Sequence, residues 1–170
     1  LVLVLNPRDA VVLEAVKPPA QRIVALPPFL DPAGWPLPPA APQPAGGPVR
    51  FLAVAMMRPG DKLASHALMA DALSRLTPLD WRLDIVGDGP ARPQVEALFA
   101  PFGGCVRFHG LVEDRGALAA LYRDSDLLLW PAVNEAFGMV FLEAALQGLP
   151  AVAGDFGGVA GVVIHGETGL

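Results

Sequence analysis

The sequence predicts an α/β protein built on a doubly wound parallel sheet. From position 50 onward, short apolar runs of strand length alternate with segments whose apolar residues recur at helical spacing. Turn residues, such as the run Gly87-Asp88-Gly89-Pro90, separate the two kinds of segment. Strands that alternate with helices form βαβ units, and such units place helices on both faces of a parallel sheet.

The expected elements follow one another along the chain. An apolar start at 1–5, a helix at 7–16 with Asn6 as its cap and Pro7 in its first turn, and a strand at 22–26 make a small unit. In the later part we expect strands at 51–57, 81–86, 106–108, 127–130 and 149–153. Helices are expected between them at 61–76, 92–99, 114–122 and 138–147, the last closed by Gly148 and then Pro150.

Proline is concentrated between these two parts. Eleven of the nineteen prolines lie between Pro18 and Pro48. Because proline lacks a backbone N–H and fixes φ, residues 32–48 cannot form a helix or an inner strand. We therefore expect residues 1–31 to be the tail of one domain, 32–48 an extended linker, and 49–170 an incomplete second domain. The start without Met, and the stop at Leu170 where another strand would begin, suggest a fragment truncated at both ends.

Composition excludes several classes of function. The chain has 170 residues, 53% of them apolar, but no apolar stretch long enough for a membrane span. A net charge of −5 without a basic stripe argues against nucleic acid as the partner. The single cysteine, Cys105, excludes an internal disulfide and a cysteine-based zinc cluster. Because zinc-binding H-E-x-x-H, G-x-S-x-G and P-loop motifs are absent, we assign no metal and no hydrolase or P-loop activity.

Two cations follow the first strand of the predicted sheet. Parallel sheets bind ligands beyond the carboxyl ends of their strands, and Arg58 and Lys62 lie at such an end. Cations at a helix start oppose its dipole by about 0.3–1 kcal/mol, which a bound anion would offset. Arginine and lysine together suit a diphosphate. The alternative is a solvated loop in which Asp61 supplies the counter-charge.

The run from Glu135 to Glu143 is the most informative stretch of the chain. Its two carboxylates bracket a Phe137-Gly138 step where a helix is expected to begin. Free N–H groups at a helix start suit a phosphate, and an acid one turn further suits sugar hydroxyls. The run therefore indicates a nucleotide-sugar site, although either glutamate alone is equally well explained as a helix surface residue. We expect this helix to bury Met139, Leu142, Ala145 and Leu146, with Glu143 at the edge of that face.

Two glycine-rich turns are weaker signals. Gly87 and Gly89 match only the first two glycines of a dinucleotide fingerprint, since Arg92 stands at the third position. Gly157 and Gly158 could bring N–H groups to an anion or a sugar. In both places an ordinary turn is an equally good interpretation.

Taken in order, several stretches resemble the carboxyl-terminal, donor-binding half of family-four retaining glycosyltransferases, which have the GT-B fold of two facing Rossmann-like domains. Any one stretch is weak evidence, but the ordered series is specific and covers about residues 50–170. The stretches are 58–62, 86–90, 106–110, 119–127, 135–143, 148–153, and 157–158 with 165–169.

The resemblance implies a role for the charged residues. Arg58 and Lys62 match the family's diphosphate-binding cations, and Glu135 matches the acid near the donor sugar and phosphate. These three are the expected catalytic residues. Glu143 matches the acid that holds the nucleotide ribose. The family loop carries Gly-Arg-Leu before its lysine, whereas this chain has Ala-Met-Met-Arg at 55–58, so Arg58 aligns only across a gap.

The resemblance also implies backbone contacts to the donor. The base is expected to pack around residues 108–111. The expected donor-binding residues, besides Glu143, are Gly87, Phe137, Gly138, Met139 and Val140.

The resemblance implies a retaining hexosyltransferase. Its donor would be a UDP-sugar or a GDP-sugar, and its acceptor would be a sugar, a lipid or a small molecule. The chain would supply the donor site without a metal and be inactive without its amino-terminal domain. We expect a cytoplasmic protein, with peripheral contact to the inner membrane as a further option. Two alternatives stay open: a non-catalytic nucleotide-sugar-binding or assembly module, and a nucleotide-sugar epimerase of the same fold.

Overall fold

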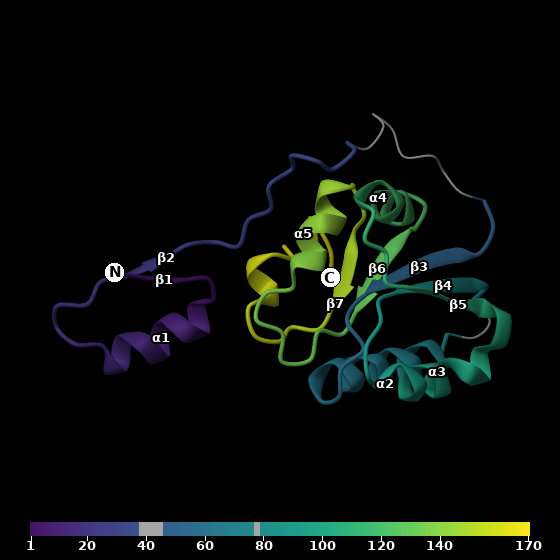
Figure 1. Ribbon diagram of the computed structural model, residues 1–170, viewed down its shortest axis with the longest axis horizontal. Helices are drawn as coiled ribbons and strands as arrows, with labels where there is room; N and C mark the ends of the chain where they lie inside the picture. Colours follow the sequence, from purple (N-terminus) through teal and green to yellow (C-terminus); the bar gives the residue numbers. More distant parts are fainter. Residues whose placement is uncertain (38–45, 77–78) are drawn as a thin grey trace.

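The computed structural model describes residues 1–37, 46–76 and 79–170, and most of them surround one parallel sheet (Figure 1). Its five strands lie in the order β5-β4-β3-β6-β7, and all neighbouring pairs are parallel. The strands are β3 (Val49–Val54), β4 (Trp81–Val86), β5 (Val106–Gly110), β6 (Leu127–Trp130) and β7 (Ala151–Ala153). The predicted α/β fold with a parallel sheet is confirmed.

Helices cover both faces of this sheet (Figure 1). Successive strand residues point to opposite faces, so Phe51 and Ala53 of β3 pack toward one pair of helices and Leu52 toward the other pair. The first pair is α2 (Asp61–Leu73) and α3 (Arg92–Phe99), and the second is α4 (Arg115–Arg123) and α5 (Met139–Leu146). Two short 3₁₀ helices, η1 (Ala100–Cys105) and η2 (Val159–Gly161), complete the elements of this part. The arrangement confirms the doubly wound sheet.

The bounds of three strands of the sheet differ from the prediction: β3, β7 and β5, which runs to Gly110 rather than to 108. Helix α2 ends at Leu73 rather than at 76. β3 ends at Val54 rather than at 57, because the chain beyond it bonds to the loop after β4 through the Met57 N–H and the Asp88 carbonyl (2.9 Å). β7 begins at Ala151 rather than at 149. The Leu149 N–H is used to close α5 on the Ala144 carbonyl (2.9 Å), and proline at position 150 has no N–H.

The buried face of α5 was predicted wrongly in part. We expected Met139, Leu142, Ala145 and Leu146 inside, but the buried residues are Phe141 and Ala144, and Ala145 is exposed. The helix is apolar almost throughout, so its sequence does not single out one face. Positive φ angles at Gly138 (70°) and Gly148 (76°) turn the chain into and out of the helix, and Phe141 and Ala144 are the residues that pack into the core.

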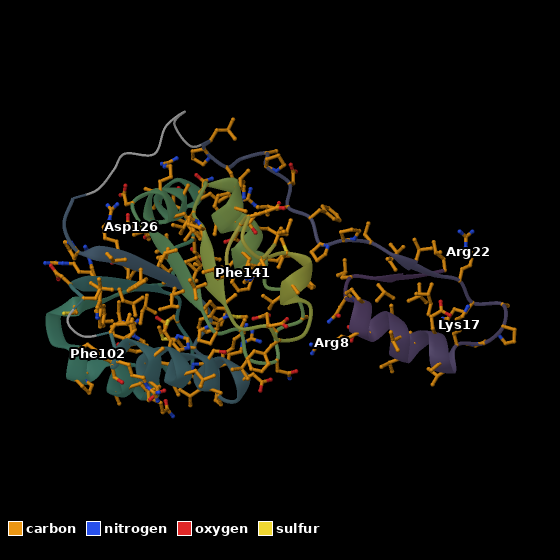
Figure 2. The ribbon with its side chains drawn as sticks, turned by 180° about the vertical axis from the view of Figure 1, so that it is seen from behind. Arg8, Lys17, Arg22, Phe102, Asp126 and Phe141 are labelled. Atoms are coloured by element: carbon orange, nitrogen blue, oxygen red, sulfur yellow. The ribbon has the colours of Figure 1, made fainter. Side chains whose placement is uncertain are left out.

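The amino-terminal residues form a separate small unit with its own two-stranded parallel sheet (Figure 1). β1 (Val2–Val4), α1 (Pro7–Val16) and β2 (Ile23–Ala25) follow in order. The predicted cap is confirmed, because the Asn6 side chain accepts the Arg8 N–H at 2.9 Å. In Figure 2, Arg8, Lys17 and Arg22 project from this unit, whereas Phe102, Asp126 and Phe141 belong to the large one.

The expected linker is described only at 32–37 and 46–48, and residues 38–45 lie outside the described residues. Its first part is bound to the large unit. Trp35 is only 9% exposed and packs beside Tyr122, with ring centroids 6.4 Å apart. The Gln147 side-chain amide donates to the Pro36 carbonyl at 3.1 Å. Residues 35 and 36 therefore serve as an anchor on α4 and the end of α5.

Residues 1–37, 46–76 and 79–170 contain no helix with the length and hydropathy of a membrane span. The same ranges hold no group of three or more His, Cys, Asp or Glu side chains placed to share a metal ion.

Candidate functional site

The loops after β3 and β4 are bonded to each other at the carboxyl edge of the sheet. The Ala91 N–H donates to the Met57 carbonyl at 2.9 Å, and the Gly87 N–H donates to the Gly110 carbonyl at 2.8 Å. A Cβ at Gly87 would lie 1.9 Å from the Ala55 carbonyl oxygen. The missing side chain of Gly87 therefore lets the loop after β3 pack against its backbone. The Gly87 N–H is already used in its hydrogen bond to Gly110. A direct role for Gly87 in donor binding stays a prediction.

The second glycine-rich turn packs in the same way. A Cβ at Gly157 would lie 1.9 Å from the Glu135 carbonyl oxygen, and one at Gly158 would lie 2.0 Å from the Ala136 carbonyl oxygen. The Gly158 N–H points to the Glu135 carbonyl at 3.3 Å. These glycines hold the loop after β7 against the loop after β6, so they fix the backbone of Glu135.

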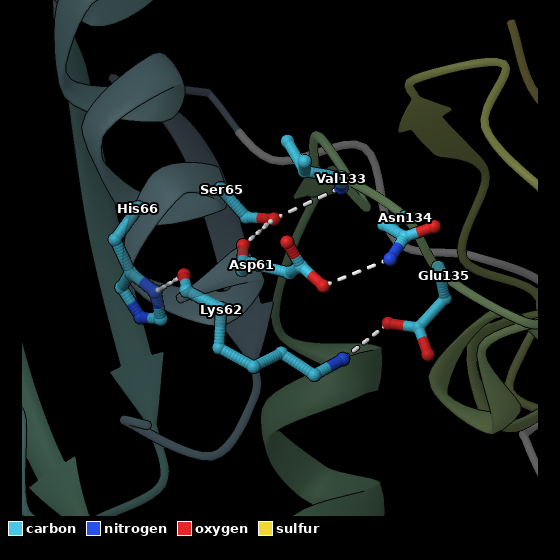
Figure 3. A network of polar contacts seen from close by, with 7 residues as sticks. All are labelled: Asp61, Lys62, Ser65, His66, Val133, Asn134 and Glu135. Atoms are coloured by element: carbon cyan, nitrogen blue, oxygen red, sulfur yellow. Dashed lines mark hydrogen bonds and ion pairs between the residues drawn. The ribbon is translucent and has the colours of Figure 1, made fainter. Parts of the chain in front are cut away.

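The amino-terminal turns of α2 hold the loop between β6 and α5 (Figure 3). Two residues of this loop, Ala132 and Asn134, have positive φ angles of 55° and 51°, which non-glycine residues adopt at a cost. Contacts to α2 stabilise that shape at successive loop residues. They are Val133 N–H to Ser65 Oγ (3.0 Å), Asn134 Nδ2 to Asp61 Oδ2 (3.0 Å), and the ion pair between Glu135 and Lys62.

Lys62 and Glu135, two of the predicted catalytic residues, are thus brought together although 73 positions separate them. Their side chains are 25% and 18% exposed, so the pair is partly shielded but still reachable from solvent. The Lys62 ammonium also lies 5.5 Å from the centre of the Trp130 ring, a cation–π contact. Arg58, the third of these residues, is exposed, and its side chain makes no hydrogen bond or ion pair with the described residues.

The start of α5 follows Glu135 directly. Gly138 caps the helix with a left-handed backbone (φ 70°), and a Cβ there would lie 2.7 Å from the Phe141 ring. Only glycine fits this turn without displacing that ring. The first N–H groups of a helix have no acceptor within it, so those of Met139 and Val140 are available to a ligand. Phe137 is half-buried and packs on the core beneath them.

Glu143 lies one turn inside α5 and is bound by a residue that the sequence analysis did not select. Its Oε2 accepts the Tyr122 hydroxyl at 2.8 Å. Tyr122 is fully buried, and this burial is the main reason why the pKa of its hydroxyl is raised. The negative charge of Glu143 raises the pKa further. The hydroxyl therefore stays protonated and donates. Tyr122 does lie in the family-like stretch 119–127, which was the only sequence signal for it.

Lys62 and Glu143 do not line the cavity of about 290 Å³ that the structure describes beside β7. That cavity is bordered by the loop after β7 and by the last residues, including Asp155, His165 and Leu170. The candidate site is instead the Lys62–Glu135 pair with the start of α5 that follows it, and Glu143 lies further along the same helix.

His66 is buried on α2, one turn after Lys62. Its Nδ1 is 2.8 Å from the Lys62 carbonyl oxygen, and its Nε2 has no hydrogen-bond partner among the described residues. The ring packs edge-on against Trp130 at 5.0 Å between centroids. Burial lowers the pKa of His66, and the positive charge of Lys62 lowers it further. The hydrogen bond to the Lys62 carbonyl raises the pKa but does not cancel the effect of burial.

We predict that His66 makes stability fall in mild acid. Its pKa is lowered on folding, so the stability is fully present above the ordinary value of 6.5 and is lost as pH falls through the folded pKa. The measurement is urea unfolding at pH 7.5 and 5.5. His66→Leu should lose less stability between the two pH values than the wild type, whereas His165→Gln, at an exposed position, should not differ from it. Equal losses in wild type and His66→Leu would contradict the prediction.

The fold is of the Rossmann-like α/β class, a parallel sheet with helices on both faces. Residues 48–170 match the family model described as Glycosyl transferases group 1. The chain belongs to this family, as the sequence resemblance predicted.

Known proteins similar to this chain agree with that family. It is 37% identical over 107 residues to a D-inositol 3-phosphate glycosyltransferase of Rhodococcus erythropolis, covering 59% of this chain and 24% of that protein. It is 34% identical over 143 residues to glycogen synthase of Mycobacterium tuberculosis, which covers 83% of this chain and 34% of that protein. The solved structure of sucrose-phosphate synthase of Thermosynechococcus elongatus superposes with a TM-score of 0.80 at 26% sequence identity. The superposition covers 99% of this chain and 44% of that structure. The chain thus spans a quarter to a third of these curated relatives and under half of this GT-B structure.

Proposed function

We propose that the intact protein is a retaining glycosyltransferase that moves a sugar from a nucleoside diphosphate-sugar to an acceptor, and that residues 49–170 supply its donor site. The observation that carries the proposal is the Lys62–Glu135 ion pair beside the open helix start at Gly138. It joins a cation, an acid and free N–H groups within one loop system, as a sugar diphosphate requires.

The proposed chemistry needs positive potential where negative charge develops. When the bond between the anomeric carbon and the diphosphate oxygen breaks, its electron pair goes to the diphosphate. Lys62, the N–H groups of Met139 and Val140, and Arg58 from the exposed loop would stabilise this leaving group without a metal. Glu135 would orient sugar hydroxyls and favour the positive charge developing on the sugar.

The nucleoside half of the donor is assigned to Glu143. Side chains on a helix lean toward its amino-terminal end, so Glu143 is directed back toward the turn at Met139. Its carboxylate can accept hydrogen bonds from ribose hydroxyls, and the base would pack around residues 108–111.

The division of the chain into an acceptor-domain tail, linker and donor domain also stays a prediction, as does a cytoplasmic location with peripheral contact to the inner membrane.

Calorimetry of the intact protein with UDP and with GDP tests the donor site. We expect one of them to bind with a Kd between about 1 μM and 1 mM, or roughly −8 to −4 kcal/mol. Glu143→Gln should weaken that binding by about 10- to 100-fold, because a hydrogen bond to a charged group contributes about 1.5–3 kcal/mol. Glu14→Gln, on α1 and 51% exposed, is the matched control and should change nothing.

A product assay separates the proposal from its alternatives. Transfer of the sugar to an acceptor with an unchanged anomeric configuration is the expected result. An epimerised nucleotide-sugar formed without acceptor would identify an epimerase, and binding without any product would identify a non-catalytic module. No heat with either nucleotide from a folded sample would remove the donor site itself.

A further inference from the structure

The hydroxyl of Tyr122 joins α4 to α5 at the candidate site. Tyr122 lies among apolar residues of the core and is fully buried. Its hydroxyl donates to Glu143 Oε2 at 2.8 Å, the one side-chain hydrogen bond it makes with the described residues. Glu143 is half-buried, so its side chain is not fully enclosed by the core.

This hydrogen bond fixes the carboxylate rather than merely touching it. A glutamate on a helix surface samples several rotamers, and a ligand that needs one of them must order the side chain on binding. The Tyr122 ring is rigid once buried, so its hydroxyl position selects one arrangement of Glu143 before a ligand arrives. The Oε1 atom has no hydrogen-bond partner among the described residues and can accept from a ligand.

Trp35 and Pro36, the anchor described above, also hold Tyr122 and the end of α5 in place. The Trp35 ring packs on Tyr122 with an angle of 60° between the ring planes, and the Arg115 guanidinium lies 5.8 Å from the Trp35 ring centre. Gln147, four residues after Glu143 and buried, is held through Pro36. The segment that leads into the domain therefore holds both the tyrosine and the helix that carries Glu143.

We propose that Tyr122 is a positioning residue for the donor: its hydroxyl holds one oxygen of Glu143 so that the other selects a ribose hydroxyl over its deoxy counterpart. The inference rests on the proposed function, because it assigns the nucleotide ribose to Glu143. It adds a specificity determinant outside the ligand-facing surface, since Tyr122 acts only through the carboxylate.

The test compares Tyr122→Phe with the wild-type intact protein. Phenylalanine keeps the ring against Trp35 and removes only the hydroxyl. Calorimetry gives the Kd of UDP or GDP, whichever binds, of its 2′-deoxy and 3′-deoxy forms, and of inorganic diphosphate. We expect the wild type to prefer the ribonucleotide over at least one deoxy form. Tyr122→Phe should reduce that preference by about 2- to 10-fold, as for the loss of one hydrogen bond, while its affinity for inorganic diphosphate stays the same.

A second variant guards against a purely structural effect. In a Glu143→Gln background, adding Tyr122→Phe should change the ribose preference no further, because the group that it positions has been replaced. A uniform loss of affinity for all ligands, inorganic diphosphate included, would overturn the positioning role. An unchanged ribose preference in Tyr122→Phe would overturn it as well and leave the donor site intact. If the folded wild type binds neither nucleotide, the proposed function falls and the positioning role falls with it.

Discussion

Lys62→Met should lower the affinity of the intact protein for UDP or GDP by about 10- to 100-fold and leave its affinity for the free nucleosides unchanged. Hydrogen bonds to charged groups contribute about 1.5–3 kcal/mol, which corresponds to this range. Methionine keeps an apolar stem near the Trp130 ring and removes only the ammonium. The loss also leaves the half-buried Glu135 without its partner, and the unpaired carboxylate repels the diphosphate. Calorimetry with nucleotide and nucleoside in parallel makes the measurement.

Two further variants separate the causes of that loss. Arg75→Met removes a cation that follows the end of α2 and is 74% exposed, so its effect on nucleotide affinity should stay within about 2-fold. The double variant Lys62→Met/Glu135→Gln removes the repulsion together with the cation and should recover part of the affinity. If nucleoside and nucleoside diphosphate lose affinity equally in Lys62→Met, Lys62 does not bind the diphosphate.

Gly87→Ala should destabilise the folded protein by about 2–6 kcal/mol. The backbone φ of 132° is one that residues with a side chain rarely adopt, and such strain costs about 1–3 kcal/mol. The new Cβ would also lie 1.9 Å from the Ala55 carbonyl oxygen and 2.8 Å from its carbon. Backbone atoms cannot rotate away as a side chain does, so the loop after β3 must shift, at a further cost of about 1–3 kcal/mol. Urea unfolding at neutral pH measures the change.

Two other glycines of this chain serve as graded controls. Gly60 has a φ of 82° but open space around a built Cβ, so Gly60→Ala should cost only the backbone strain, about 1–3 kcal/mol. Gly104 has neither a positive φ nor a neighbour within 4 Å, so Gly104→Ala should change stability by less than about 0.5 kcal/mol. The expected order of cost is Gly104, Gly60, Gly87. A cost at Gly87 no greater than at Gly60 would show that the two loops do not press on each other there.

Local signals in the sequence were sufficient for the order and type of the elements. The helix at Pro7–Val16 has the predicted bounds, because a cap at Asn6 and a proline in the first turn act within a few residues of one another. The strand at Trp81–Val86 and the helix at Arg92–Phe99 also agree with the prediction. Boundaries failed where a distant partner decides them, as at Met57, whose N–H bonds to the loop after β4.

The candidate site was predictable in its charges but not in its supports. Lys62 and Glu135 were selected from separate stretches because parallel strands bring their carboxyl ends to one edge, and the structure pairs them. Tyr122 and His66 were not selected, since a buried tyrosine or histidine within an apolar helix face looks like any core residue. Their contacts to Glu143 and to the Lys62 backbone depend on how the helices dock.

The sequence by itself determined the α/β alternation, the family and the residue types at the ends of the strands, because these follow from periodicity and from local order along the chain. Only the tertiary structure decided which face of α5 is buried, that the paired glycines press on neighbouring loops, and that Trp35 packs on Tyr122. Each of these depends on contacts between residues far apart in the chain, and such contacts are fixed only when the helices and loops pack together.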